Sequence, residues 1–388
     1  MAAVRICIAY DCLFPYTVGG AERWYRNLAE RLAAEGHEVT YLTRRQWARS
    51  EHAEIDPRVR VAVTVGPWMG LYTKSGRRRI LTPLLFGMGV LLHLLRHGRR
   101  YDVLHTSSFP YFSLLAAGLL RPLLGYELVV DWFEVWSRSY WRDYLGGVGG
   151  AVGALVQRAC AMVPQRAFCF SELHGKRLRE LGLHGPVTIL RGLYAGTSEP
   201  PAPGPPEELV VFAARLIPEK GATLGVAAMA LATQRIDGLR GEFLGDGPER
   251  GALQAAIAEH GLQETISAPG FADADTVDAE MRRALCMLLP SRREGYGMVV
   301  VEAAARGTPS VVVAGEDNAA TELIEEGVNG TIAERADAES VAEAIVRVHE
   351  GGMPMRASTA GWFAEHAEEL SLESSLRIVL ESYASARA

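Results

Sequence analysis

Short runs of apolar residues alternate with amphipathic stretches along the first half of the chain. The run VRICIAY at 4–10 predicts a buried strand, and AERWYRNLAERLAAEGH at 21–37 predicts an amphipathic helix that ends at Gly36. Further strands are predicted at 38–44, 101–108 and 127–133 and at the start of 167–183. Continuous apolar strands separated by helices are typical of a parallel sheet that is covered on both faces.

Composition changes abruptly at 198–208, SEPPAPGPPEE, where five prolines exclude a helix or a central strand. The alternation begins again after this linker, with strands predicted at 209–216 and 286–291. The sequence therefore predicts an α/β protein of two Rossmann-like, doubly wound domains that face each other across a cleft. The predicted bounds are 1–199 for the N-terminal domain, 200–208 for the linker, 209–361 for the C-terminal domain and 362–388 for C-terminal helices that pack back toward the N-terminal domain.

Composition and charge narrow the class of protein. The chain has 388 residues, 48% of them hydrophobic and 22% charged, as in an ordinary globular protein of two domains. A net charge of −6 argues against general binding to nucleic acids. Five scattered cysteines without a CxxC pair predict free thiols in a reducing compartment rather than disulfides or a zinc site. The first apolar run is too short for a signal peptide, so we expect a cytoplasmic protein.

One apolar segment, ILTPLLFGMGVLLHLLRH at 80–97, has basic flanks. It is shorter than the ~20 residues that span a bilayer, and it contains a proline and a histidine. The basic residues are Arg77, Arg78 and Arg79 before it and Arg96, Arg99 and Arg100 after it. Two interpretations remain open: a buried helix with solvated ends, or a helix that rests on an anionic membrane surface and makes the protein a peripheral membrane protein.

Two glutamates, Glu294 and Glu302, flank a glycine-rich loop in SRREGYGMVVVEAAARG at 291–307. Gly295 and Gly297 let the backbone turn sharply and approach a ligand. The free N–H groups of the following helix favour an anion such as phosphate. An acidic residue one to two turns further on is suited to a ribose diol. The alternative is a helix start with ordinary surface charge.

In each domain, one further candidate loop follows the first strand. In AARLIPEKG at 213–221, Arg215 offers a planar fork for phosphate oxygens and Lys220 a mobile charge. Together they are suited to a diphosphate, although a solvated loop is the ordinary alternative. Gly19 and Gly20 precede the predicted helix in the N-terminal domain, where a tight turn is the commoner explanation.

Five segments occur in a characteristic order: GGAE at 19–22, AARLIPEKG at 213–221, GDGPER at 245–250, PSRREGYGMVVVEAAARGTPSVV at 290–312 and DNAATELIEEGVNG at 317–330. In this order they resemble family 4 nucleotide-sugar glycosyltransferases of the GT-B fold, which carry a Glu-x7-Glu motif at this place. The resemblance covers nearly the whole chain. It implies a nucleoside-diphosphate-sugar donor on the C-terminal domain and an acceptor mainly on the N-terminal domain. It also implies transfer with retention at the anomeric carbon, without a metal ion or other cofactor.

Carried over residue by residue, the resemblance assigns Arg215 and Lys220 to the donor diphosphate, Glu294 to hydroxyls of the transferred sugar and Glu302 to the ribose. Arg215, Lys220 and Glu294 are thereby the predicted catalytic residues. Retention by front-face attack, with a donor phosphate oxygen taking the acceptor's proton, needs no protein base. The other predicted donor contacts are Gly19 and Gly20 from the opposite domain, Gly295, Tyr296, Gly297, Met298 and Val299 around the loop, and Gly270 and Phe271 near the base.

The segment VVDWFEVW at 129–136 departs from the family pattern, because Phe133 stands where many relatives have a histidine. Asp131 or Glu134 would then supply a polar contact to the sugar or acceptor, and Trp136 would stack on the acceptor. Packing within the domain is the alternative for this aromatic group. His105, at the end of a predicted strand, is a further candidate contact, although a lone histidine is more often structural.

The predicted function is therefore a retaining glycosyltransferase that acts on a lipid-linked sugar, an envelope glycan or a small metabolite. Alternatives with the same fold are a sugar-nucleotide epimerase, a phosphorylase or a non-catalytic sugar-nucleotide-binding partner. A dinucleotide-dependent oxidoreductase is disfavoured, because no GxGxxG follows either first strand. The expected partners are the nucleotide sugar, its acceptor and the inner membrane face, without nucleic acid.

Overall fold

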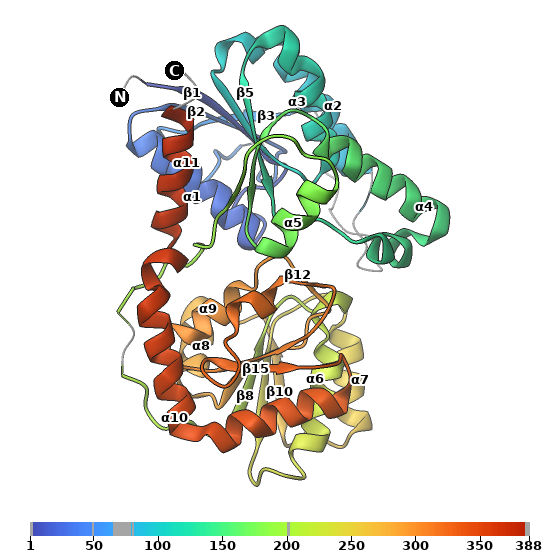
Figure 1. Cartoon of the computed structure of the whole chain (residues 1–388), viewed down its shortest axis with the longest axis vertical. Helices are drawn as coiled ribbons and strands as arrows, with labels where there is room; N and C mark the ends of the chain where they lie inside the picture. Colours follow the sequence, from blue (N-terminus) through green and yellow to red (C-terminus); the bar gives the residue numbers. More distant parts are fainter. Residues whose placement is uncertain (1–2, 49, 65–78, 80, 200–201, 385–388) are drawn as a thin grey trace. The chain divides into compact units, whose positions relative to one another are not determined.

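A computed structural model describes residues 3–48, 50–64, 79, 81–199 and 202–384 (Figure 1). The chain divides into two compact units. Unit 1 contains the described residues up to Leu193 together with those from Leu372 onward, and unit 2 contains Tyr194–Ser371. Each unit is built around its own parallel sheet, so the structure is α/β throughout, as the apolar pattern predicted.

Unit 1 has seven strands among its described residues, in the order β3-β2-β1-β4-β5-β6-β7. All of their pairings are parallel. The strands are β1 (Arg5–Ala9), β2 (Glu38–Thr43), β3 (Arg60–Val63), β4 (Val103–Ser107), β5 (Glu127–Trp132), β6 (Arg166–Cys169) and β7 (Val187–Ile189). The helices are α1 (Gly20–Ala34), α2 (Leu81–His97), α3 (Tyr111–Leu124), α4 (Arg138–Ala161), α5 (Glu172–Glu180) and α11 (Leu372–Ala384). The predicted strands at 4–10, 38–44, 101–108 and 127–133 all form.

Unit 2 has a six-stranded sheet in its described residues, in the order β10-β9-β8-β11-β13-β15. Its strands are β8 (Leu209–Ala213), β9 (Arg240–Leu244), β10 (Ile266–Gly270), β11 (Cys286–Leu289), β13 (Ser310–Val313) and β15 (Gly330–Ala333), beside a small pair of β12 (Arg293–Glu294) and β14 (Asp317–Asn318). Its helices are α6 (Ala222–Ala232), α7 (Arg250–Glu259), α8 (Ala274–Arg283), α9 (Met298–Ala304) and α10 (Ala338–Leu370).

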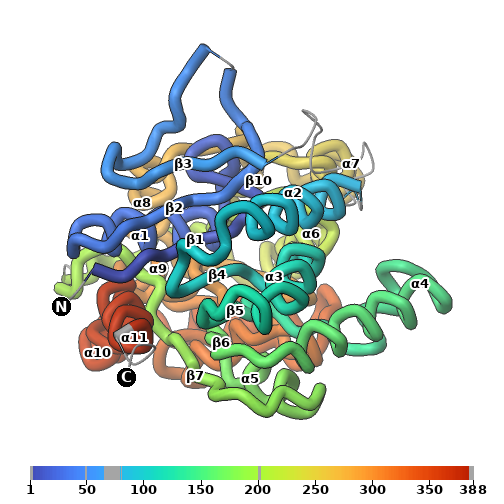
Figure 2. The backbone as a smooth tube through the Cα atoms, turned by 90° about the horizontal axis from the view of Figure 1, so that it is seen from above, coloured from blue at the N-terminus to red at the C-terminus, as the bar shows by residue number. Residues whose placement is uncertain are grey.

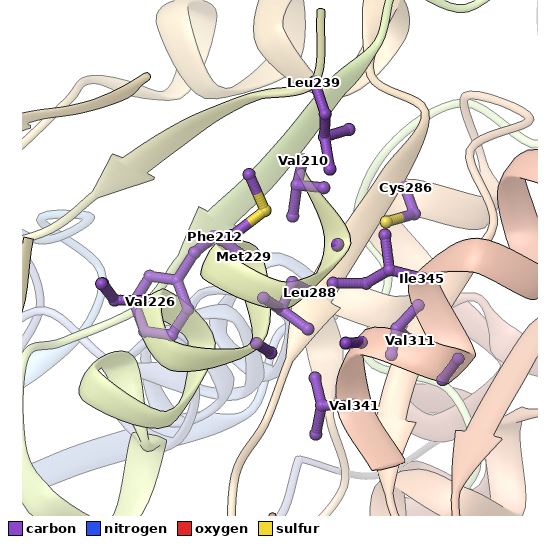
Figure 3. Close-up of a cluster of buried hydrophobic side chains, with 14 of the residues drawn as sticks. Val210, Phe212, Val226, Met229, Leu239, Cys286, Leu288, Val311, Val341 and Ile345 are labelled. Carbon is purple, nitrogen blue, oxygen red and sulfur yellow. The ribbon is translucent and has the colours of Figure 1, made fainter. Parts of the chain in front are cut away.

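The core of unit 2 explains why its central strands are apolar on both faces. Val210 and Phe212 of β8, Leu288 of β11 and Ile345 of α10 are fully buried in one cluster, with Met229 of α6 beside them (Figure 3). Other buried residues, among them Val211 and Met287, form a second cluster. Because each side chain of this kind contributes about 1.5–3 kcal/mol when buried, the central strands are held firmly and present their carboxyl ends as a fixed edge.

The division between the units differs in detail from the predicted bounds. Unit 2 begins at Tyr194, before the proline-rich linker, whose residues 200 and 201 lie outside the described residues. The predicted C-terminal helices beyond residue 361 are split, because α10 continues to Leu370 within unit 2. Only α11 belongs to unit 1, where Tyr383 is buried. The break falls at Ser371, which caps the end of α10 in extended conformation.

Leu81–His97 of the apolar segment form α2, although residue 80 and, from the predicted basic flank, Arg77 and Arg78 lie outside the described residues. None of the described helices, α2 included, is long and apolar enough to cross a membrane. Phe86, Val90 and Leu94 are fully buried against the rest of unit 1. The opposite side of the helix is exposed, so neither interpretation of this segment is complete by itself.

Candidate functional site

The predicted donor residues of unit 2 gather where its strand order reverses. β8 and β11 are neighbours, and the sheet continues from β8 through β9 and from β11 through β13. In such sheets, ligands bind outside the carboxyl ends of the strands at this reversal. The loop after β8 carries Arg215 and Lys220, and the loop after β11 carries Glu294. The topology therefore brings two segments about 75 residues apart in sequence to one place.

Lys220 and Glu294 form an ion pair at this position. Lys220 Nζ donates a hydrogen bond to Glu294 Oε1 at 2.5 Å. The two side chains are 20% and 10% exposed, so the pair is largely shielded but still open to a ligand. An ammonium group has three donors, and this bond uses one of them. Arg215, in the same loop, is exposed.

Glu294 is positioned by a second loop that crosses beside it. Arg293 and Glu294 pair in parallel with Asp317 and Asn318. The buried Asn318 side chain donates to the carbonyl oxygens of Ser291 at 3.0 Å and Val313 at 2.8 Å. These hydrogen bonds tie the segment after β11 to the segment after β13, and they hold the backbone of Glu294 in one orientation.

Two glycines allow the loops to pack this closely. Gly297 has a φ of 99°, and a Cβ atom there would lie 2.7 Å from Cβ of Ala320. Gly221, directly after Lys220, has a φ of 65°, and a Cβ atom there would lie 2.5 Å from the carbonyl oxygen of Pro290. Only glycine combines this conformation with this space. In the predicted glycine loop, glycine is therefore needed both for the turn of the backbone and for the close contact with the neighbouring loop.

The remaining predicted donor residues of unit 2 lie along the same sheet edge or at the start of α9. α9 begins at Met298, as the glycine loop predicted, and Glu302 is half-buried within it. Tyr296 is buried, whereas Gly295, Met298 and Val299 are half-buried. Gly270 ends β10, and the side chain of Phe271 after it is 74% exposed. An exposed phenyl ring at a strand's carboxyl end offers a flat apolar surface to a ligand.

In unit 1 the glycine pair lies at the start of a helix. Gly19 is the N-cap of α1, which begins at Gly20, directly after the loop that follows β1. A Cβ atom on Gly19 would collide with the carboxylate of Glu22 in the first turn. An acidic group is favoured at this position by the helix dipole.

His105 and Asp131 are not exposed to a ligand in unit 1, contrary to the predicted direct contact. Both side chains are fully buried, and His105 Nε2 lies 2.9 Å from Asp131 Oδ1. The other ring nitrogen of His105 hydrogen-bonds to the hydroxyl of Tyr383 in α11. Asp131 Oδ2 accepts a hydrogen bond from Trp24 Nε1 at 2.7 Å. Burial also raises the pKa of Tyr383 well above its usual value, so its hydroxyl stays protonated.

The aromatic residues after β5 pack mainly against one another. Phe133 stacks on Phe170 with ring centroids 4.5 Å apart, and both rings are nearly parallel. Trp136 Nε1 donates to Glu134 at 2.6 Å, which occupies the indole donor. The ring of Trp136 also contacts the buried Trp141 at 4.5 Å. Phe133, Glu134 and Trp136 are nevertheless half-buried, so each keeps an accessible edge.

Sequence analysis missed three residues that organise these sites. Asn318 lies in the quoted segment DNAATELIEEGVNG, but nothing local shows that its amide joins two loops. Trp24 and Tyr383 complete the buried group around Asp131 and His105 from opposite ends of the chain. Among the described residues, no group of three or more His, Cys, Asp or Glu side chains is arranged to hold a metal ion.

Comparison with known proteins agrees with the fold of both units. The family described as Glycosyltransferase Family 4 matches residues 18–192, and the family described as Glycosyl transferases group 1 matches residues 198–361. A chain built from two such domains, each with a parallel Rossmann-like sheet, is a GT-B glycosyltransferase. It belongs to the family 4 (GT4) type of these enzymes.

One curated relative spans nearly the whole chain, whereas others match about a third of it. A D-inositol 3-phosphate glycosyltransferase from Jonesia denitrificans is 25% identical over 94% of this chain and 91% of its own. An alpha-D-kanosaminyltransferase from Streptomyces kanamyceticus is 29% identical, over 36% of each chain. Among solved structures, sucrose-phosphate synthase from Thermosynechococcus elongatus has a TM-score of 0.79 at 19% identity and covers 98% of both chains. Anabaena HepE in complex with UDP and glucose has a TM-score of 0.70 at 17% identity, over 98% of this chain and 100% of its own.

Proposed function

We propose that this glycosyltransferase moves a sugar from a nucleoside-diphosphate sugar to an acceptor with retention at the anomeric carbon and without a metal ion. The observation that carries the proposal is the Lys220–Glu294 ion pair, at 2.5 Å, where the strand order of unit 2 reverses. It combines a cation for phosphate with a carboxylate for sugar hydroxyls at one point. The complexes of Anabaena HepE with UDP and with UDP-glucose support a donor of this class.

Lys220 and Arg215 are assigned to the donor diphosphate. One Lys220 donor is used by Glu294, and two remain for phosphate oxygens. The exposed guanidinium of Arg215 adds a planar fork from the same loop. Negative charge grows on the diphosphate as its bond to the sugar breaks, and fixed cations stabilise that charge. This stabilisation is what a metal ion supplies in other transferases.

Glu294 is assigned to the transferred sugar and Glu302 to the ribose. One oxygen of Glu294 accepts from Lys220, and a carboxylate has several acceptor positions, so the group can also accept from sugar hydroxyls. Its backbone is held by the pairing with Asp317 and Asn318, so the carboxylate direction is set before the donor binds. We assign Gly295, Tyr296, Gly297, Met298 and Val299 to the phosphates and sugar, and Gly270 with Phe271 to the base.

Retention follows if the acceptor attacks from the side on which the diphosphate leaves. The acceptor oxygen forms its bond to the anomeric carbon as the carbon–oxygen bond to the diphosphate breaks. The acceptor's proton passes to an oxygen of the departing phosphate, so no protein base is required. The position of Glu294 supports this account, because its Oε1 already accepts a hydrogen bond from Lys220 Nζ.

Unit 1 is assigned to the acceptor, with Phe133, Glu134 and Trp136 as its candidate contacts. Their half-buried edges, rather than His105 or Asp131, offer the accessible surface. The acceptor class is a lipid-linked sugar, an envelope glycan or a small metabolite. We place the enzyme in the cytoplasm, and the five buried free cysteines support a reducing compartment.

The stereochemistry can be tested without knowing the acceptor, because water can replace it. We expect slow hydrolysis of the correct α-linked nucleotide sugar to release the α-anomer first, as proton NMR would record before mutarotation. Release of the β-anomer first would contradict retention. Interconversion of the sugar on the intact nucleotide, with no nucleoside diphosphate formed, would instead show an epimerase.

A further inference from the structure

Apolar side chains form an exposed stripe along α2. Leucine and methionine residues recur three or four positions apart on its outer side, and their exposure lies between 38% and 59%. They are Leu81, Leu84, Met88, Leu92 and Leu95. This spacing places all of them on one face of the helix, opposite the buried Phe86 and Val90. The stripe has the periodicity of a buried helix face but is open to solvent.

The exposed apolar surface continues on the two helices that follow. α3 packs against α2 and against α4, and Figure 2 shows α2 and α3 next to each other while one end of α4 projects outward from them. On α3, Leu119 and Leu123 are 69% and 70% exposed. On and just after α4, the exposed apolar residues are Val148, Val152, Leu155 and Met162. We call these eleven residues the α2–α4 face.

Monomeric proteins rarely leave an apolar surface of this extent uncovered. Val148 is 83% exposed and Leu155 is 67% exposed, so these side chains are not the margins of a core. Large apolar residues on three neighbouring helices are expected where another apolar surface, of a protein or of a lipid membrane, covers them.

The charges around the α2–α4 face indicate what covers it. Neither α2 nor α3 contains an aspartate or glutamate, and α4 contains one, Asp143. Exposed arginines lie on α2 and α4 and directly after α2, although the chain as a whole has a net charge of −6. They are Arg96, Arg99, Arg100, Arg138, Arg142 and Arg158. Apolar residues bordered by arginines match a lipid surface with anionic headgroups.

We propose that the α2–α4 face docks on an anionic lipid membrane and that the acceptor is therefore lipid-borne. The docking itself is independent of the chemistry, whereas the acceptor class rests on the proposed function. A second copy of the chain is the competing occupant, but it would bring two arginine-bordered faces together and set like charges against each other. The membrane instead neutralises those charges while covering the apolar residues.

The test is flotation of the full chain with vesicles, in the absence of donor and acceptor. We expect binding to vesicles of equal parts phosphatidylcholine and phosphatidylglycerol, and little binding to phosphatidylcholine alone. Arg99→Gln with Arg100→Gln should weaken partition about 25-fold, since each arginine near an anionic surface contributes about fivefold. Met88→Glu should weaken it by roughly tenfold or more, because an apolar side chain no longer enters the lipid.

Met353→Glu is the matched control, since Met353 is similarly exposed, at 41% against 51% for Met88, but lies in unit 2. Its partition should equal that of the wild type, and all variants should keep the wild-type unfolding temperature and nucleotide affinity. Absence of binding to the anionic vesicles would overturn the proposal. So would self-association of the wild type that Met88→Glu abolishes while vesicle binding persists unchanged. Vesicle binding by a chain that transfers no sugar would sustain the docking face and contradict only the proposed function.

Discussion

Replacing Lys220 with alanine is expected to lower kcat by about 10²–10³-fold at saturating donor, with a much smaller effect on folding. The ammonium group is proposed to stabilise the charge that develops on the leaving diphosphate, and the loss of one such preorganised group has an effect of this size. The measurement is the rate of nucleoside diphosphate release, followed with thermal unfolding of the same preparation. Normal turnover at saturating donor would contradict the assignment of Lys220.

Lys176→Ala is the matched control for this variant. Lys176 is 77% exposed on α5 and lies 4.0 Å from Glu180, so it is a lysine in a solvent-exposed pair of unit 1 and is not part of the loops at the strand reversal of unit 2. Its turnover should equal that of the wild type. A double-mutant cycle with Glu294→Gln should also be non-additive, because Lys220 and Glu294 share a hydrogen bond and act on neighbouring parts of the donor.

The second large effect is expected on stability, from Asp131→Ala. Asp131 is fully buried between Trp24 Nε1, at 2.7 Å, and His105 Nε2, at 2.9 Å. Removal of the carboxylate leaves the buried Trp24 Nε1–H without its acceptor and His105 without the carboxylate beside it, which we expect to lower the free energy of unfolding by about 3–5 kcal/mol. Chemical denaturation followed by tryptophan fluorescence measures this. Asp131→Asn keeps an acceptor oxygen for Trp24, so it should lower the free energy of unfolding by less than Asp131→Ala does.

This variant also separates a structural role from the predicted ligand contact. Asp56→Ala is the control, because Asp56 is paired with Arg58 on the surface and its removal should change stability far less. Asp131→Ala could instead unfold like the wild type and bind acceptor or donor poorly. Asp131 would then have no structural role, and direct contact with the ligand would be the correct interpretation.

The parts of the fold that local pattern determines could be predicted from the sequence. The run at 4–10 became β1 because four of its residues are buried between two helix layers, and apolar continuity reports such burial directly. The meeting of Lys220 and Glu294 could be anticipated as well. Both follow central parallel strands, and the carboxyl ends of such strands lie at one edge.

What could not be predicted depends on contacts between distant segments. His105 was a candidate ligand contact because it was predicted at the end of a strand, but it lies in the middle of β4, and its partner Tyr383 lies 278 residues away in α11. No local pattern shows that a C-terminal helix covers it. Asn318 is similar, since its amide joins the segments after β11 and β13. For the α2–α4 face, the sequence pointed only to α2, because the glycine-rich α4 has no clear apolar periodicity.

The most direct test of the account is a thermal-shift panel of UDP, GDP, ADP and TDP with the wild type and Glu302→Ala. A ligand that binds the native state raises its unfolding temperature by mass action. We expect one of the four to do so, and we expect Glu302→Ala to shrink that shift through a loss of affinity of about tenfold or more, as its hydrogen bonds to the ribose are lost. Glu259→Ala, which changes an exposed glutamate at the end of α7, should respond like the wild type. No shift with any of the four nucleotides, or an equal shift in Glu302→Ala, would contradict a nucleotide-sugar site at the strand reversal of unit 2.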